Sequence, residues 1–131
     1  MTEEGQAYRR ARTQEQKDRR LGDILDATES ILDEGSYHDV TLSAIAERVG
    51  CSRANLSHYV KSKEEILLLL YIRSLRETLE DLREIDPTIL DASSADGLKD
   101  AAARLASVLS AHRNLGRLGA LLTSIIETNV G

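Results

Sequence analysis

The chain has 131 residues, 41% of them hydrophobic and 30% charged, so its composition excludes a disordered chain and allows a buried core. Its net charge of −5 at pH 7 argues against indiscriminate binding to nucleic acid but leaves room for a local basic surface. Helix formers dominate, the only proline is Pro87, and Phe and Trp are absent. The composition therefore predicts an all-α protein.

Residue types that carry metal or covalent chemistry are few. The single cysteine, Cys51, excludes an internal disulfide framework, and a structural role fits it better than a redox role. His38, His58 and His112 stand far apart in the chain, so we expect no metal site and no cofactor. Glycine-rich phosphate loops and nucleophile motifs are missing as well. We therefore expect a protein that is not an enzyme.

Export or membrane insertion is not indicated by the sequence. The first residues lack the apolar stretch of a signal peptide. The longest apolar run, residues 66–72, falls short of the ~20 residues that span a bilayer. Together with the lack of disulfides, these features lead us to expect a cytoplasmic protein.

Residues 1–18 show no apolar periodicity, and we expect a flexible basic arm there. Six basic side chains cluster ahead of the first apolar helix: Arg9, Arg10, Arg12, Lys17, Arg19 and Arg20. A solvated arm and a contact with nucleic acid both explain this cluster, and both interpretations stay open.

Three short helices are predicted next. Apolar residues at helical spacing run from Leu21 to Leu32, and Gly35 is a natural residue to end that helix. Tyr37 is expected to fold back as an aromatic plug. Thr41 is the predicted N-cap of a second helix that Gly50 ends. A third helix, capped by Ser52, turns three residues inward: Leu56, Tyr59 and Val60.

The second half is predicted to be a helical region, residues 67–131. Ser62 and Glu65 form a capping box at the start of the longest predicted helix, which runs to about Ile85. That helix carries an apolar stripe, which consists of Leu68, Ile72, Leu75, Leu79 and Leu82. Asp86–Pro87 ends it, residues 87–90 are expected to form a short turn, and residues 92–97 a polar linker. Two further helices are expected over roughly residues 95–112 and 115–128. The last is apolar around much of its circumference, which requires burial in a core or against a second subunit.

The spacing from Leu42 to Lys61 is that of a helix-turn-helix. Ala46 is small where two helices must cross closely, and Gly50 can take the positive φ of a sharp turn. Cys51 fills the apolar position after the turn, and Leu56 and Tyr59 close the small core.

Residues 20–68 resemble the DNA-binding domain of the tetracycline-repressor-like (TetR) family of transcriptional regulators. The resemblance rests on Leu56, Tyr59 and five runs: Ile24–Ala27, Gly35–Tyr37, Thr41–Ala46, Gly50–Ser52 and Lys61–Ile66. Residues 118–130 resemble, more weakly, a helix in the ligand-binding half of some members. The implied fold is a three-helix DNA-binding domain, residues 19–66, joined by a long helix to a partial bundle.

Two departures from the family pattern matter. Ser57 stands where the family commonly has a phosphate-contacting tyrosine, and Val60 where it has phenylalanine. Family members are also longer. Either the ligand-binding and dimerisation region, residues 67–131, is truncated, as expected here, or the dimer is built differently.

The resemblance implies a repressor that binds a palindromic double-stranded operator as a homodimer and responds to a small ligand. Arg53 would then pair with guanine and Asn55 with adenine, and Thr41, Tyr59 and Lys63 would hold phosphates. The expected DNA-binding residues are Arg19, Arg20, Thr41, Ser52, Arg53, Ala54, Asn55, Ser57, His58, Tyr59 and Lys63. The ligand-binding residues stay unknown, with weak candidates in Leu75, Leu79, Leu105, Leu109, Leu118 and Leu122, for which a core role is favoured. The alternative is a helical protein-interaction module that keeps the fold without binding DNA.

Overall fold

A computed structural model describes residues 2–87 and 93–130, which form helices and connecting turns without any strand. The expected all-α class is confirmed. The chain divides into two compact units, Met1–Leu67 and Leu68–Gly131, and the divide falls inside one continuous helix, α4 (Lys63–Arg83). No helix among the described residues is long and apolar enough to cross a membrane.

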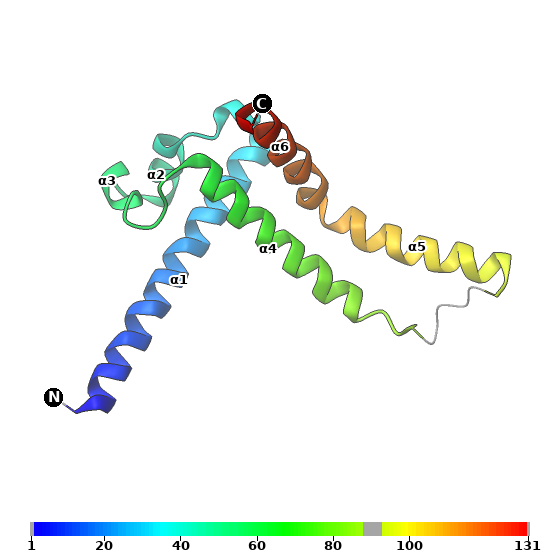
Figure 1. Ribbon diagram of the computed structural model, residues 1–131, viewed down its shortest axis with the longest axis horizontal. Coiled ribbons are helices and arrows are strands. Elements are labelled where there is room, and N and C mark those ends of the chain that lie inside the picture. The colour runs from blue at the N-terminus through cyan, green and yellow to red at the C-terminus, as the bar shows by residue number, and fades with distance from the viewer. Residues whose placement is uncertain (1, 88–92, 131) are drawn as a thin grey trace. The chain divides into compact units, whose positions relative to one another are not determined.

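The first unit begins with α1 (Glu3–Glu34), a single helix of 32 residues (Figure 1). The expected flexible arm at residues 1–18 is therefore wrong for residues 3–18. Helix-forming Glu, Gln, Ala and Arg fill this stretch, and Glu3 and Glu4 in the first turn interact favourably with the helix dipole. The stretch lacks apolar periodicity because its described side chains are exposed and need no apolar face.

The second half of α1 supplies the core of the first unit. Its buried side chains recur at the predicted spacing, at Ile24, Leu25, Ala27, Thr28, Ile31 and Leu32. Buried residues from the later segments are Val40, Ile45, Ala46, Leu56, Val60, Ile66 and Leu67. Thr28, although polar, satisfies its hydroxyl by donating to the Ile24 carbonyl oxygen at 2.8 Å.

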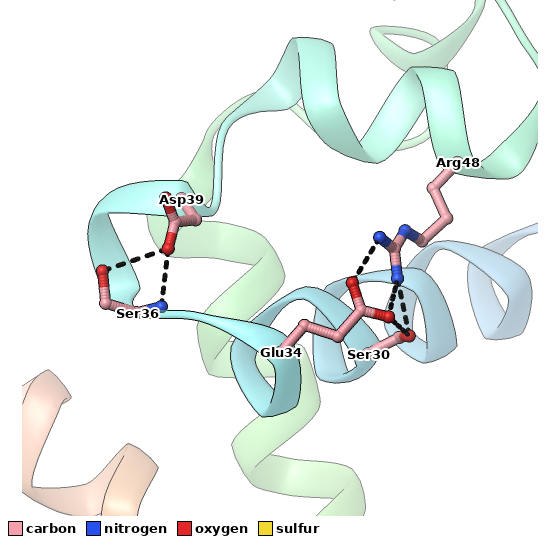
Figure 2. Close-up of polar contacts among 5 residues, drawn as sticks. All are labelled: Ser30, Glu34, Ser36, Asp39 and Arg48. Atoms are coloured by element: carbon pink, nitrogen blue, oxygen red, sulfur yellow. Dashed lines mark hydrogen bonds and ion pairs between the residues drawn. The ribbon is translucent and has the colours of Figure 1, made fainter.

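A short connection leads from α1 to the next helix through the 3₁₀ turn η1 (Tyr37–Asp39). The Ser36 backbone N–H donates to Asp39 Oδ2 at 2.7 Å (Figure 2). A Cβ at position 35 would collide with that same carboxylate oxygen, which explains Gly35. Tyr37 is half-buried and meets the His38 ring edge-on, with ring centroids 5.9 Å apart. It lies at the edge of the core and does not plug it.

In the second unit, the last part of α4 is followed by α5 (Ala95–Ala111) and α6 (Arg113–Val130). Both agree with the predicted ranges to within two residues. α4, with 21 residues, is shorter than α1, so it is not the longest helix as expected. Ser94 caps α5 by accepting from the Gly97 N–H at 3.0 Å, so the polar linker ends three residues before its predicted end. Residues 88–92 of the predicted turn and linker lie outside the described part of the chain.

Much of the apolar surface of the second unit is exposed. Leu68, Ile72, Leu75 and Leu79 of α4 are 38–48% exposed, although the pattern predicted packing against other helices. Of the six leucines favoured as core, Leu75, Leu79, Leu105 and Leu109 are exposed, Leu122 is half-buried, and Leu118 is fully buried. The core expectation is therefore wrong for four of them in the single chain. The sequence pattern identifies an apolar face but not the segment that covers it.

Candidate nucleic-acid interface

The turn between α2 (Leu42–Val49) and the following helix has the geometry that the sequence predicts. Thr41 Oγ1 accepts a hydrogen bond from the Ala44 N–H at 3.0 Å and caps the start of α2. Gly50 ends α2 in the left-handed region, with φ of 82°. The N–H groups of Gly50 and Cys51 both donate to the Ala46 carbonyl oxygen at 3.0 Å. These bonds close a sharp turn directly after α2.

α3 (Arg53–Leu56) is a single helical turn. Ser52 Oγ accepts from the Asn55 N–H at 3.1 Å, as its predicted capping role requires. Leu56 and Val60 are 1% and 2% exposed, so they anchor the segment in the core. Between these anchors Ser57 and His58 are exposed and Tyr59 is half-buried.

A polar clamp holds the end of α1 against α2. The Arg48 guanidinium donates to both carboxylate oxygens of Glu34, at 2.8 and 2.7 Å, and to Ser30 Oγ at 2.7 Å (Figure 2). The hydrogen bond from Arg48 lowers the pKa of Glu34, and the same bond raises the pKa of Arg48. A bidentate pair of this kind constrains orientation as well as distance, so it fixes the angle at which the helix-turn-helix leaves α1.

Lys63, at the first position of α4, is held inside the first unit. Its Nζ donates to the Tyr37 carbonyl oxygen at 2.8 Å and lies 3.6 Å from the centroid of the Tyr37 ring. Burial lowers the pKa of Lys63, while the Glu64 carboxylate acts in the opposite direction. A cation near a helix N-terminus is unfavourable for the helix dipole, so its placement there calls for a partner. The structure supplies an internal partner, so this placement alone does not identify a phosphate contact.

The outward face of the α3 segment carries most of the predicted contact residues. Ser52, Arg53, Ala54, Asn55, Ser57 and His58 are exposed. Ser57 Oγ donates its proton to the Arg53 carbonyl oxygen at 3.0 Å, so this hydroxyl is left as an acceptor rather than as the donor that a phosphate contact requires. Thr41 is exposed beside the start of α2. The segment thus presents Arg, Asn and His side chains to solvent.

One hollow joins α1 to this face. It measures about 310 Å³ and is lined by Arg20, Cys51, Asn55, His58 and Tyr59. Arg20 and Tyr59 are half-buried, whereas Arg19 is exposed on α1. Cys51 is also half-buried and lines the hollow, so it does not fill the core position expected for it. The structure therefore brings Arg20 next to Asn55 and His58, although they are more than thirty residues apart in sequence.

The sequence analysis missed the clamp residues Ser30, Glu34 and Arg48. The sequence shows Arg48 near the end of the predicted second helix, but a basic residue in the last turn of a helix usually only interacts with the helix dipole. Its pairing with Glu34 depends on how α1 and α2 cross. Among the described residues, His, Cys, Asp and Glu side chains do not gather into a group of three or more that could hold a metal ion.

Comparisons with known proteins place this geometry in a family. Residues 24–70 match the family model for bacterial regulatory proteins of the tetR family. The fatty acid metabolism regulator protein of Bacillus subtilis (strain 168) is 31% identical over 61 residues, which cover 47% of this chain and 31% of the relative. The matched part is thus about a third of that relative's length. No solved structure matches the chain. Residues 24–70 therefore form a helix-turn-helix domain of the type found at the N-terminus of tetR-family regulatory proteins.

Proposed function

We propose that this chain is a sequence-specific DNA-binding transcriptional regulator of the cytoplasm, a ligand-responsive repressor that binds a palindromic operator as a homodimer. The observation that supports DNA binding best is the exposed face of α3. Its core anchors, Leu56 and Val60, are buried, while Arg53, Asn55 and His58 are exposed. An exposed polar helix that follows a capped α2 and a left-handed glycine is suited to entering a major groove.

The side chains on that face suit base recognition. An arginine can donate two hydrogen bonds to guanine, and an asparagine can pair with adenine, each worth about 1–3 kcal/mol of discrimination. Arg53 and Asn55 are exposed. Whether their side chains reach the base edges depends on how the rest of the domain contacts the DNA backbone. We assign phosphate contacts to Arg19, Arg20, Thr41, Tyr59 and Lys63, and supporting positions to Ser52, Ala54 and Ser57.

Homodimerisation and effector binding are assigned to the second unit. Its exposed leucines and a surface groove of about 400 Å³, lined by Ile72, Leu75, Arg76, Leu79, Glu80 and Arg83, support both roles. A dimer would place two copies of α3 one helical turn of DNA apart. An effector with different affinity for the DNA-bound and DNA-free conformations would then shift the equilibrium between them.

The test is a selection from a random DNA library, followed by titrations over a salt series. We expect submicromolar binding to the selected sequence and a steep salt dependence. Arg53→Ala should weaken binding by about 1–3 kcal/mol at one base position and relax specificity there. Arg104→Ala is the matched control, because Arg104 lies on α5 in an exposed ion pair with Asp100. It should bind like the parent.

Solution mass, measured by light scattering, tests the dimer separately. A mass twice that of the 14.5 kDa chain supports the homodimer. A monomer at every concentration used for DNA binding would contradict it. If no sequence is enriched even at low salt, DNA binding itself is refuted.

The second candidate is a helical protein-interaction module without DNA binding. The exposed apolar side chains of the second unit favour it, because monomeric proteins seldom leave many large apolar residues uncovered. They include Leu68, Ile72, Leu75, Leu79, Leu98, Leu105, Leu109 and Ile126. A chain that forms a stable complex with a protein but enriches no DNA sequence would support this candidate.

A further inference from the structure

The first half of α1 carries opposite charges on opposite sides. Residues 7–20 hold six Arg or Lys side chains and two Asp or Glu. An α-helix has 3.6 residues per turn, so positions 11 apart point in nearly the same direction. Arg9, Arg20 and Ile31 stand in one such row, and Glu4, Glu15 and Asp26 stand in another. Five residues separate the two rows, which places them on roughly opposite sides of the helix.

The basic row continues the buried side of α1. Ile31 is 6% exposed and belongs to the core of the first unit, and Arg9 and Arg20 lie on the same line of the helix. The acidic row continues on the outer side, where Asp26 is exposed. The basic side therefore faces the direction in which the helix-turn-helix packs.

Arg20 connects this basic side to the recognition face. It lines the hollow that also contains Asn55, His58 and Tyr59. From there α1 runs back to Glu3, away from α2 and α3 (Figure 1). Arg9 and Arg20 are about 17 Å apart along the axis, at 1.5 Å per residue. That is about half of the ~34 Å helical turn of DNA, a span that offers many phosphates.

This stretch is helical before it meets any partner. Residues 6–20 contain neither glycine nor proline, and Thr13 Oγ1 donates back to the Arg9 carbonyl oxygen at 2.9 Å. A preformed helix loses less conformational entropy on binding than a flexible arm. It also keeps its acidic side turned away from a partner that its basic side contacts.

We propose that residues 7–20 form a rigid helical arm whose basic half of the circumference binds the phosphates of duplex DNA beside the helix-turn-helix site. Arg9 and Arg20 lie at the middle of that half, and Arg10, Arg12, Lys17 and Arg19 lie toward its two edges. The proposal rests on the proposed DNA-binding function and enlarges its footprint. A lipid surface is the less suitable partner, because membrane-surface helices need bulky apolar residues on one side. Between residues 3 and 20 the only large apolar or aromatic side chain is that of Tyr8.

The decisive variant carries Arg9→Gln, Arg10→Gln, Arg12→Gln and Lys17→Gln in the full chain. Each lost phosphate contact should reduce the slope of log K against log salt by about 0.9, so four contacts reduce it by about 3.6. At low salt we expect affinity to fall about tenfold or more for every sequence, with base preference unchanged. Circular dichroism should show an unchanged helix content, because all four side chains are exposed.

Two further variants test the sidedness and the rigidity of the arm. Glu4→Gln with Glu15→Gln alters the acidic side and should bind as tightly as the parent or more tightly. Thr13→Pro keeps every basic charge but breaks the helix in its exposed half. It should lose affinity and salt dependence as the fourfold variant does. If Thr13→Pro binds like the parent, a rigid helix is not required and the proposal is overturned.

The failure of the arm can be distinguished from the failure of the DNA-binding function. If the fourfold variant keeps the parent's affinity and salt slope while Arg53→Ala loses base preference, the arm proposal is wrong and the proposed DNA-binding function is still supported. If the parent binds no DNA, both are wrong. Binding of the parent to vesicles of anionic lipid, lost in the fourfold variant, with no arm-dependent DNA binding, would also overturn the proposal.

Discussion

Gly50 turns the chain between α2 and α3 with φ of 82°, the only positive φ among the described residues. A Cβ at this position would meet nothing within 4 Å. The requirement for glycine therefore comes from backbone conformation and not from crowding. Gly35 differs, because there a Cβ would displace the Asp39 carboxylate from its bond to Ser36.

We expect Gly50→Ala to destabilise the fold by about 1–2 kcal/mol, the cost of a left-handed conformation for a residue with a Cβ. The matched control is Gly22→Ala. Gly22 lies within α1, and a Cβ there would also meet nothing within 4 Å. That variant should be more stable by about 0.5–1 kcal/mol. Urea unfolding measures both changes, and equal shifts of the same sign would contradict the argument.

The contacts at the start of α4 separate what a local sequence pattern predicts from what it does not. The capping residues Ser62 and Glu65 were predicted correctly: Ser62 Oγ accepts from the Glu65 N–H at 3.1 Å. The Glu65 carboxylate accepts from the Lys61 N–H at 2.7 Å, one residue away from the partner that the motif predicts. The bond between Lys63 and Tyr37 was not predicted. It joins residues 26 apart, beyond the range over which a local pattern carries information.

At the scale of elements, the Glu34–Arg48 clamp joins the end of α1 to the end of α2. The pKa of Glu34 is lowered in the folded chain, first by the hydrogen bond from Arg48. A lowered carboxyl pKa means that the clamp stabilises the fold above the ordinary pKa of glutamate and that this contribution is lost as pH falls through the folded pKa. Both side chains are partly or largely exposed, at 39% and 62% for Arg48 and Glu34, so the effect is small and sensitive to salt.

We therefore expect Glu34→Gln to lower Tm slightly at pH 7 and to have a diminishing effect as the pH falls through the lowered folded pKa of Glu34, where the parent carboxylate becomes protonated. The two Tm-against-pH curves should converge on the acid side. Ser30→Ala removes the neutral partner of Arg48 and a long hydrogen bond to Glu34 Oε1 but keeps the carboxylate. It serves as the control, and its curve should depart from a line parallel to the parent much less than that of Glu34→Gln, because Ser30 is the smallest cause of the lowered pKa of Glu34. A Glu34→Gln curve parallel to the parent would show that the carboxylate charge contributes nothing.

The element that sequence analysis misjudged most was the first half of α1. Hydrophobic periodicity identifies helices that bury one side, and residues 3–20 bury little. Helix propensity, dipole-compatible Glu3 and Glu4, and continuity with the packed half of α1 were the better guides. The same exposure leaves its charges available, as the proposed contact with DNA requires.

At the scale of the molecule, the two units differ in how completely they bury their apolar side chains. In the first unit the helices pack around Ile24, Ile45 and Ile66, all 0% exposed. In the second unit α5 has no buried residue. Leu118 is fully buried, and Tyr71 lies 3.6 Å from where a Cβ of Gly119 would stand. His112 Nε2 lies 2.5 Å from Asp81 Oδ2, a polar tie between α4 and the junction of α5 and α6.

This contrast predicts different costs for two leucine truncations. Leu118→Ala should destabilise the chain by about 2–5 kcal/mol, because it leaves a cavity in a buried site. Leu79→Ala, at a site 47% exposed, should cost under ~1 kcal/mol. Urea unfolding at several protein concentrations measures both. If Leu79→Ala costs as much as Leu118→Ala and its effect grows with protein concentration, a second chain covers this side of α4 in solution.

The sequence by itself determined the all-α class, the ends of α2 to α6 to within a few residues, the caps at Thr41, Ser52 and Ser62, and the left-handed turn at Gly50. These features depend on side chains within about four positions of the backbone groups that they satisfy. Only the tertiary structure decided that Arg20 lies beside the α3 segment, that Lys63 bonds to Tyr37, and which leucines are covered. Those outcomes depend on contacts between segments distant in the chain, and no local pattern encodes the angle at which two helices cross.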